Sequence, residues 1–134
     1  MIVVGRGTVA ASLGVNPTDA ELGEQGCLVR TVGPHVVLAG TARAGTLFGV
    51  RRFLEETVGV RWYAPGVTRM PRHQDLVIPA LDWLIRPGFA WREVSYTWPG
   101  GDAEFRSRRG CNSGSGGPDD PLGEQYAFAG TCHT

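Results

Sequence analysis

Apolar runs along the first 86 residues predict a β–α–β–β–α–β order of elements. Four short runs, rich in β-branched residues and closed by glycine or proline, predict strands at residues 2–5, 27–33, 35–40 and 60–64. Only Gly33-Pro34 separates the middle two runs, so they predict an antiparallel hairpin with a tight turn. Two helix-compatible segments, 9–15 and 16–26, fill the gap before this hairpin.

The strongest helix signal lies at residues 45–58. Its apolar residues recur at the 3.6-residue spacing of one helix face, and its charged residues occupy the other face. Two Arg–Glu pairs stand four residues apart, a spacing worth about 0.2–0.5 kcal/mol each, namely Arg51–Glu55 and Arg52–Glu56. Gly59 follows, and it predicts that the helix ends at a residue in the left-handed conformation.

The pattern changes after residue 86. Residues 75–85 are extended but interrupted by Pro79, which predicts an edge strand or a connector, and Pro87 marks a predicted domain boundary. Beyond it, residues 89–98 predict a new strand, and residues 102–110 predict a short helix. Residues 111–123 have the composition of turns and loops.

These elements predict an α+β fold. For residues 1–86 we expect a mixed β-sheet of about four or five strands with two helices on one face. Residues 87–134 are expected to be the incomplete start of a second domain, a (β/α) barrel. The chain is therefore expected to be a fragment of a longer protein.

Composition and charge narrow the classes of partner. A hydrophobic content of 42% with 19% charged residues is typical of globular rather than disordered chains. The formal net charge is zero, which provides no basic field for nucleic acid or an anionic membrane. No apolar run approaches the length of a membrane-spanning helix. We therefore expect neither nucleic acid nor a membrane as partner.

The cysteines predict no metal site and no disulfide framework. Cys27, Cys111 and Cys132 form no Cys-x-x-Cys pair, and a zinc site needs more ligands at short spacing. Free or buried thiols are the expected state, and no cofactor is predicted. Cys132 and His133 could in principle act as a nucleophilic thiolate and its base, but side chains of sequence neighbours rarely meet in the required geometry.

The acidic residues provide no catalytic pair. A glycosidase needs two carboxylates that flank the scissile bond, whereas Glu55-Glu56 are predicted on the solvated face of a helix. Asp102 and Glu104 open a predicted helix, where acids interact favourably with the helix dipole. Asp119-Asp120 lie in a glycine-rich turn segment.

A glycine motif near the start leaves open a nucleotide-binding α/β domain. Gly5-x-Gly7-x-x-Ala10 directly follows a predicted strand, as in a dinucleotide-binding turn. Gly14 breaks the following segment early, and the second strand carries no acid at its end to bind a ribose. The nucleotide-binding interpretation is therefore the less favoured alternative.

Aromatic residues are dense in the second half of the chain. Trp62 and Tyr63 are neighbours on one predicted strand, so their side chains point to opposite faces, and at most one packs under the helix. Aromatic faces can stack on sugar rings, although core packing is the more common use of any one of them. Exposed aromatics leave open a small stand-alone binding or interaction module.

One long stretch resembles a known family. GTLFGVRRFLEETVGVRWYAPG, followed by MP and DLVIP, resembles the non-catalytic N-terminal domain that precedes the barrel of many glycoside hydrolases. It is similar to the chitobiase-type domain of family 20 hexosaminidases and to its counterpart in family 67 α-glucuronidases. The closest resemblance is to bacterial proteins that carry domain of unknown function 4838, whose tyrosines are replaced here by Phe48 and Arg51.

The resemblance covers residues 1–86 and implies an accessory domain of a carbohydrate-active, glycoside hydrolase-like parent, secreted or periplasmic. The family's catalytic acids lie later in its barrel, so this chain is expected to be inactive alone. Its partners would be the barrel domain of its own chain and, through the parent, carbohydrate. The implied substrate-facing residues are Arg92, Asn112 and His133.

The same resemblance assigns a role to residues 59–66. We expect this segment to be the central strand of the sheet, with one aromatic packed under the preceding helix. Arg61 would stand beside the aromatics, in position to pair with an acid across the domain interface.

Overall fold

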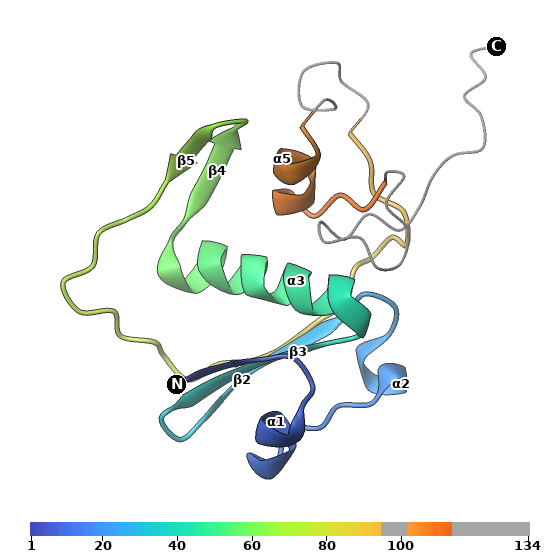
Figure 1. Ribbon diagram of the computed structural model, residues 1–134, viewed down its shortest axis with the longest axis vertical. Helices are drawn as coiled ribbons and strands as arrows, with labels where there is room; N and C mark the ends of the chain where they lie inside the picture. Colours follow the sequence, from blue (N-terminus) through green and yellow to red (C-terminus); the bar gives the residue numbers. More distant parts are fainter. Residues whose placement is uncertain (95–101, 114–134) are drawn as a thin grey trace.

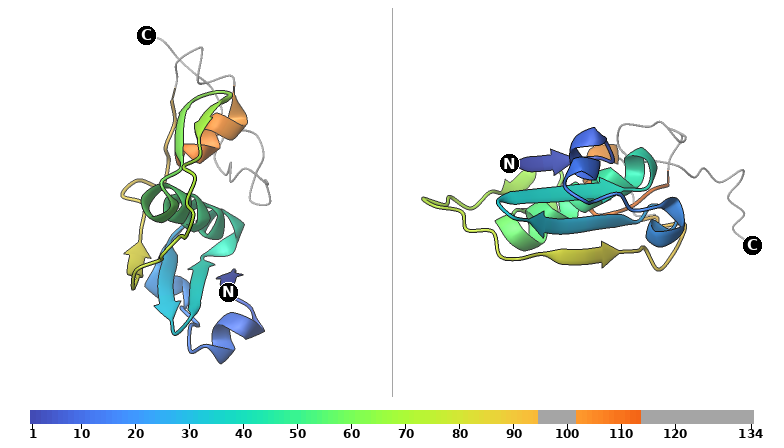
Figure 2. Two further views of the ribbon diagram at one scale, coloured as in Figure 1. Left: turned by 90° about the vertical axis from the view of Figure 1, so that its left-hand side faces the viewer. Right: turned by 90° about the horizontal axis from the view of Figure 1, so that it is seen from below.

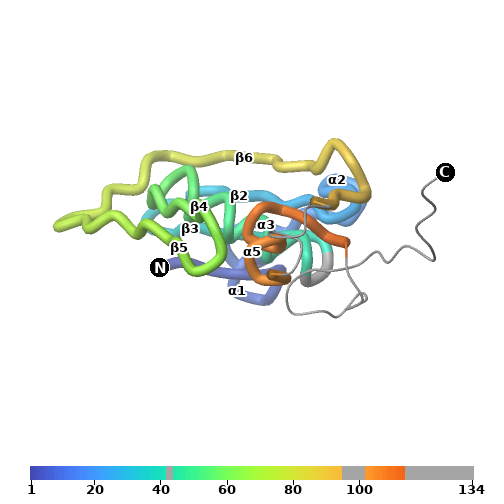
Figure 3. Tube along the Cα trace, turned by 90° about the horizontal axis from the view of Figure 1, so that it is seen from above, coloured from blue at the N-terminus to red at the C-terminus, as the bar shows by residue number. Residues whose placement is uncertain are grey.

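The computed structural model describes residues 1–94 and 102–113 and contains a four-stranded mixed sheet (Figure 1). The strands lie in the order β1-β3-β2-β6, which Figure 3 shows from above. They are β1 (Ile2–Val4), β2 (Cys27–Val32), β3 (His35–Gly40) and β6 (Asp82–Ile85). β1 runs parallel to β3, whereas β2 is antiparallel to both of its neighbours. The expected α+β class and the predicted hairpin are confirmed.

Helices cover both faces of this sheet (Figure 2). The short helices α1 (Thr8–Ser12) and α2 (Asp19–Leu22) share one face, and α3 (Ala42–Phe53) covers the other. Two helices, α1 and α2, do share one face, but the long helix predicted at residues 45–58 lies on the opposite face. The reason is the apolar alternation of β3, whose successive side chains enter two different cores.

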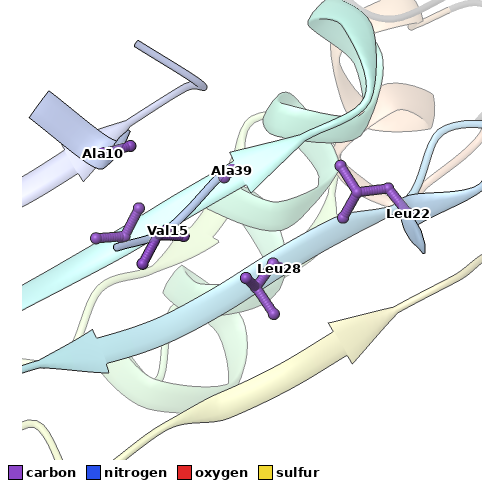
Figure 4. Packing of buried hydrophobic residues seen from close by; sticks show 6 residues of the cluster. Ala10, Val15, Leu22, Leu28 and Ala39 are labelled. Atoms are coloured by element: carbon purple, nitrogen blue, oxygen red, sulfur yellow. The ribbon is translucent and has the colours of Figure 1, made fainter. Parts of the chain in front are cut away.

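Each face has its own buried cluster. On the α1 and α2 side, Ala10, Val15 and Leu22 pack on Leu28 and Ala39 of the sheet (Figure 4). On the α3 side, Phe53 is buried among a set of sheet and connector residues, namely Cys27, Val29, Val36, Leu38 and Leu81. Both faces of β2 and β3 are thus dehydrated, as their nearly continuous apolar runs predict.

Local signals define the helix ends. α2 begins with a capping box, in which the Thr18 hydroxyl accepts from the Glu21 backbone N–H and the Glu21 carboxylate accepts from the Thr18 backbone N–H. α3 continues into a π-helical turn, η1 (Leu54–Val58), and ends at Gly59 with φ of 83°. The predicted helix and its glycine stop are therefore confirmed, with a start a few residues earlier than the periodicity indicates.

Residues 59–66 do not form the central strand of the sheet, so that expectation is wrong. β4 (Arg61–Ala64) pairs only with β5 (Val67–Arg69), in a separate two-stranded sheet beyond α3 (Figure 1). The central position is taken instead by the β2–β3 hairpin, because these two strands have apolar residues on both faces. Gly66, with φ of 71°, lies in the tight turn that reverses the chain between β4 and β5.

The neighbouring aromatics of β4 divide as predicted. The Trp62 side chain is buried with Val60, Phe105 and residues of η1, whereas Tyr63 is 60% exposed. Arg61 donates to the carbonyl oxygens of Glu55 and Val60, so it fastens the chain after α3. An acid partner for Arg61 across a domain interface is not observed among the described residues.

The segment after residue 86 packs against the first 86 residues. In that segment, α5 (Ala103–Arg108) places Phe105 against Trp62. Before it, β6 is an edge strand, one of the two alternatives predicted for residues 75–85. Residues 89–94 contain no strand, so the predicted strand at 89–98 is wrong for its described part, and residues 95–98 lie outside the described residues. The division into domains at residue 86 and the barrel start stay predictions. Over the described ranges, no helix is long and apolar enough to cross a bilayer.

Candidate functional site

The structure brings together two of the three residues that the family resemblance implies as substrate-facing. The backbone N–H of Arg92 donates to Asn112 Oδ1 at 2.8 Å, and the backbone N–H of Asn112 donates to the Arg92 carbonyl oxygen at 3.0 Å. Asn112 is 0% exposed, and its Nδ2 also donates to the Ala90 carbonyl oxygen at 2.5 Å. His133 lies outside the described residues.

A buried glutamine from the other end of the chain joins this pair. Gln25 Oε1 accepts from Asn112 Nδ2 at 2.9 Å and from Arg92 Nη2 at 2.7 Å. The Gln25 side chain is held between α2 and β2 by a backbone with φ of 58°, a left-handed conformation that is uncommon outside glycine. We call Gln25, Arg92 and Asn112 the junction cluster, because it joins residues before and after residue 86.

The Arg92 guanidinium is bound by protein oxygens. Nε donates to the Gly110 carbonyl oxygen at 2.7 Å, and Nη1 donates to the Phe89 carbonyl oxygen at 2.6 Å. Its carbon Cζ lies 5.2 Å from the centre of the Phe48 ring, a cation–π geometry. The Arg92 side chain therefore links Gln25 to Gly110, and its N–H groups point to oxygens of the protein.

Sequence reasoning missed Gln25. The residue lies in the GEQG stretch, which the sequence marks only as the end of a helix-compatible segment. Nothing local indicates that its amide meets side chains 67 and 87 positions later. The unusual feature, a non-glycine residue in a left-handed conformation, is visible only in the backbone.

A basic pocket adjoins the junction cluster. It has a volume of about 220 Å³, and Arg92 forms part of its wall. Four further arginines line it, namely Arg51, Arg52, Arg108 and Arg109. Phe48 provides an aromatic surface, and both Arg51 and Arg92 lie over its ring.

A second cavity, of about 410 Å³, lies on the opposite face of the sheet beside β6. Two carboxylates line it, but both already have structural partners. Glu21 caps α2, and hydrogen bonds from the Thr18 backbone N–H and hydroxyl lower its pKa. Asp82 Oδ1 accepts from Arg30 Nε at 2.8 Å. A glycosidase acid needs a raised pKa, so the lowered pKa of Glu21 is the opposite of what that role requires.

The other acids considered from sequence that the structure describes also have structural roles, and Asp119-Asp120 lie outside the described residues. Asp102 Oδ1 caps α5 by accepting from the Phe105 backbone N–H at 2.7 Å, and Glu104 pairs with Arg108. Glu56 pairs with Arg52 at 3.5 Å, as the helix spacing predicts. Arg51, the predicted partner of Glu55, instead donates to the carbonyl and hydroxyl oxygens of Ser107.

The described residues gather no metal ligands and form no dinucleotide-binding unit. No group of three His, Cys, Asp or Glu side chains comes together in them. Cys27 and Cys111 are free, buried thiols. A dinucleotide site requires a parallel β–α–β unit, whereas β1 and β2 are antiparallel to each other, since β1 runs parallel to β3 and β2 antiparallel to it.

Comparisons of the chain with protein-family models, with curated proteins and with solved structures found no match.

Proposed function

We propose that residues 1–86 form a non-catalytic accessory domain of a carbohydrate-active, glycoside hydrolase-like protein. Residues 87–134 then begin the domain that it carries, and carbohydrate binds to the parent rather than to this chain alone. The proposal rests on the motif GTLFGVRRFLEETVGVRWYAPG for the family. The observation that carries the accessory role is the junction cluster.

The junction cluster supports this role because it places buried hydrogen bonds between two parts of the chain. Asn112 and Gln25 are fully or almost fully buried, and burying such amides is costly unless they are paired. Their partners fix the start of the following segment on the accessory domain. A rigid junction of this kind is what a domain needs if it orients the next one.

The positions of the acids support the absence of catalysis by this chain. Glu21, Asp82, Asp102 and Glu104 each accept hydrogen bonds or pair with arginine as part of the fold. The proposal therefore expects no hydrolysis of aryl glycosides by the purified 134-residue chain. Turnover that follows the chain through purification would contradict it.

The junction itself is tested by limited proteolysis with mass spectrometry. We expect a protected piece that extends beyond residue 86 to at least residue 113 in the wild type. The Gln25→Ala variant should be cut within residues 87–94 while residues 1–86 stay protected. Equal cleavage at 87–94 in both proteins would show that the junction does not hold the following segment.

A second candidate is a stand-alone binding module, favoured by exposed aromatics. Tyr63, Phe89 and Trp91 are all exposed, and aromatic faces can stack on sugars or on partner side chains. This candidate expects the isolated chain to bind a soluble oligosaccharide or a protein partner, with loss of binding in Tyr63→Ala or Phe89→Ala. The accessory-domain proposal expects no such binding by the chain alone.

A further inference from the structure

We propose that the basic pocket between α3 and α5 binds a phosphate group, either as inorganic phosphate or as the ester of a small molecule. The inference does not depend on the accessory role. It rests on the excess of guanidinium groups around one cavity, on the incomplete neutralisation of Arg51 and on the aromatic surface beside it.

Positive charge is concentrated in this pocket although the whole chain is formally neutral. Five guanidinium groups line it, against the single carboxylate of Glu55. Glu56 and Glu104 pair with two of these arginines from outside the lining. Even when both are counted, the guanidinium groups outnumber the carboxylates, which favours an anionic ligand.

Arg51 is bound by uncharged groups of the protein. Its Nη1 donates to the carbonyl and hydroxyl oxygens of Ser107, which carry no formal charge. Within the described ranges, no carboxylate lies close enough to Arg51 to form an ion pair. Burial and the neighbouring Arg108 lower the pKa of Arg51 to about 10, and Glu104 opposes this only in part. An anion in the pocket would compensate this charge.

Arg52 and Arg109 stand at the exposed rim. Arg52 lies 3.5 Å from Glu56, and Arg109 lies 3.5 Å from Glu55. Both distances exceed the roughly 2.7–2.9 Å of a charge-assisted hydrogen bond, so donors of both groups can turn to an incoming oxyanion. The planar guanidinium matches phosphate oxygens in a bidentate manner.

The rest of the lining is apolar and suits the carbon skeleton of a small ester. Phe48, Ile85 and Pro87 form this part of the wall. The Phe48 ring also orients Arg51, whose Cζ lies 5.8 Å from the ring centre. The volume of about 220 Å³ restricts the ligand to a small molecule.

The test is calorimetric titration of the 134-residue chain with inorganic phosphate at constant ionic strength. We expect saturable binding at one site, weakened about tenfold in Arg109→Gln and in Arg52→Gln, since each removes a charge-assisted contact worth about 1.4 kcal/mol. Glu55→Gln should tighten binding because it removes the only carboxylate of the lining. Two half-exposed rim arginines are used so that the fold is preserved.

Arg69→Gln is the matched control, because Arg69 is an exposed arginine of β5 outside the pocket. It should leave the affinity unchanged although it alters the net charge by the same amount. Absence of saturable binding by the wild type would overturn the proposal. Equal weakening by Arg69→Gln, or acetate binding as tightly as phosphate, would also overturn it.

A titration with glucose 6-phosphate distinguishes the two sources of the phosphate group. Tighter binding of the ester than of inorganic phosphate would support a phosphorylated small molecule that uses the apolar wall. Equal affinities would support a site that recognises the phosphate group alone. Both results uphold the phosphate site, and each specifies its ligand.

Discussion

Asn112 and Arg92 exchange hydrogen bonds at the junction, with Asn112 Oδ1 accepting from the Arg92 backbone N–H and the Arg92 carbonyl oxygen accepting in return. We expect Asn112→Ala to lower the free energy of unfolding by about 1–3 kcal/mol, because the partly buried Arg92 N–H and the buried Gln25 side chain lose a hydrogen-bond partner. Urea denaturation followed by circular dichroism measures this difference.

Asn16→Ala serves as the control for this change. Asn16 is exposed, so the same substitution there should alter the free energy of unfolding by less than about 0.5 kcal/mol. An equal loss in the two variants would show that the junction cluster contributes no more stability than a surface position does.

The adjacent aromatics of β4 provide a second prediction. Trp62 is 8% exposed and packs with Val60 and Phe105, so Trp62→Ala should cost about 3–5 kcal/mol through the cavity that it leaves. Tyr63→Ala should cost far less, since its side chain points to solvent. Denaturant midpoints of both variants, measured side by side, check the difference. Similar midpoints would mean that β4 is not anchored through Trp62.

The close approach of α3 to the backbone just before β2 provides a third prediction. A Cβ on Gly45 would lie 2.4 Å from the Gly26 carbonyl oxygen, and backbone cannot move aside as a side chain can. Gly45→Ala should therefore cost about 1–3 kcal/mol, the usual range for overpacking. A Cβ on Gly88 meets nothing within 4 Å, so Gly88→Ala is the matched control and should be nearly neutral. Melting temperatures of both variants and of the wild type measure the two changes, and equal shifts in the variants would contradict the close approach.

A fourth prediction concerns the Cys27 thiol. Burial raises its pKa from 9.0 to about 11, so the thiolate is scarce near about pH 8. Iodoacetamide at that pH should leave Cys27 unmodified in the folded chain and modify it once urea unfolds the chain. Peptide mass spectrometry gives the labelled fraction. Fast labelling of folded protein would contradict the buried position.

The same shift predicts a pH dependence of stability. The unfolded chain loses the thiol proton near pH 9, and the folded chain loses it only near pH 11. Between these values the unfolded state binds fewer protons, so the Cys27 contribution to the free energy of unfolding is lost as pH rises through this window. Cys27→Ala should remove this part of the pH dependence of the free energy of unfolding. If the variant and the wild type lose stability equally between these pH values, Cys27 does not contribute.

Local patterns in the sequence were sufficient to predict several of the helices and strands. The 3.6-residue stripe and Gly59 predict α3 with η1, and the apolar runs around Gly33-Pro34 predict the β2–β3 hairpin. Pro79 predicts an edge strand or a connector within residues 75–85, and β6 is an edge strand there. In each case the signal lies within a few residues of the element, because turn chemistry and amphipathic spacing act over that range.

Part of the candidate site also followed from the sequence. The family resemblance implied Arg92 and Asn112 as substrate-facing residues, and the structure places them in contact, while their role toward a substrate stays a prediction. Gln25 and the basic pocket were not expected. The arginines of that pocket come from three separate segments, so no spacing along the chain relates them.

The sequence by itself determined where most helices and strands form, since capping, periodicity and turn residues are local causes. Only the tertiary structure decided that β4 leaves the main sheet, that α3 lies opposite α1 and α2, and that Gln25 meets Asn112. These choices depend on which apolar faces can be buried against each other. The benefit of that burial appears only when distant segments are already in place.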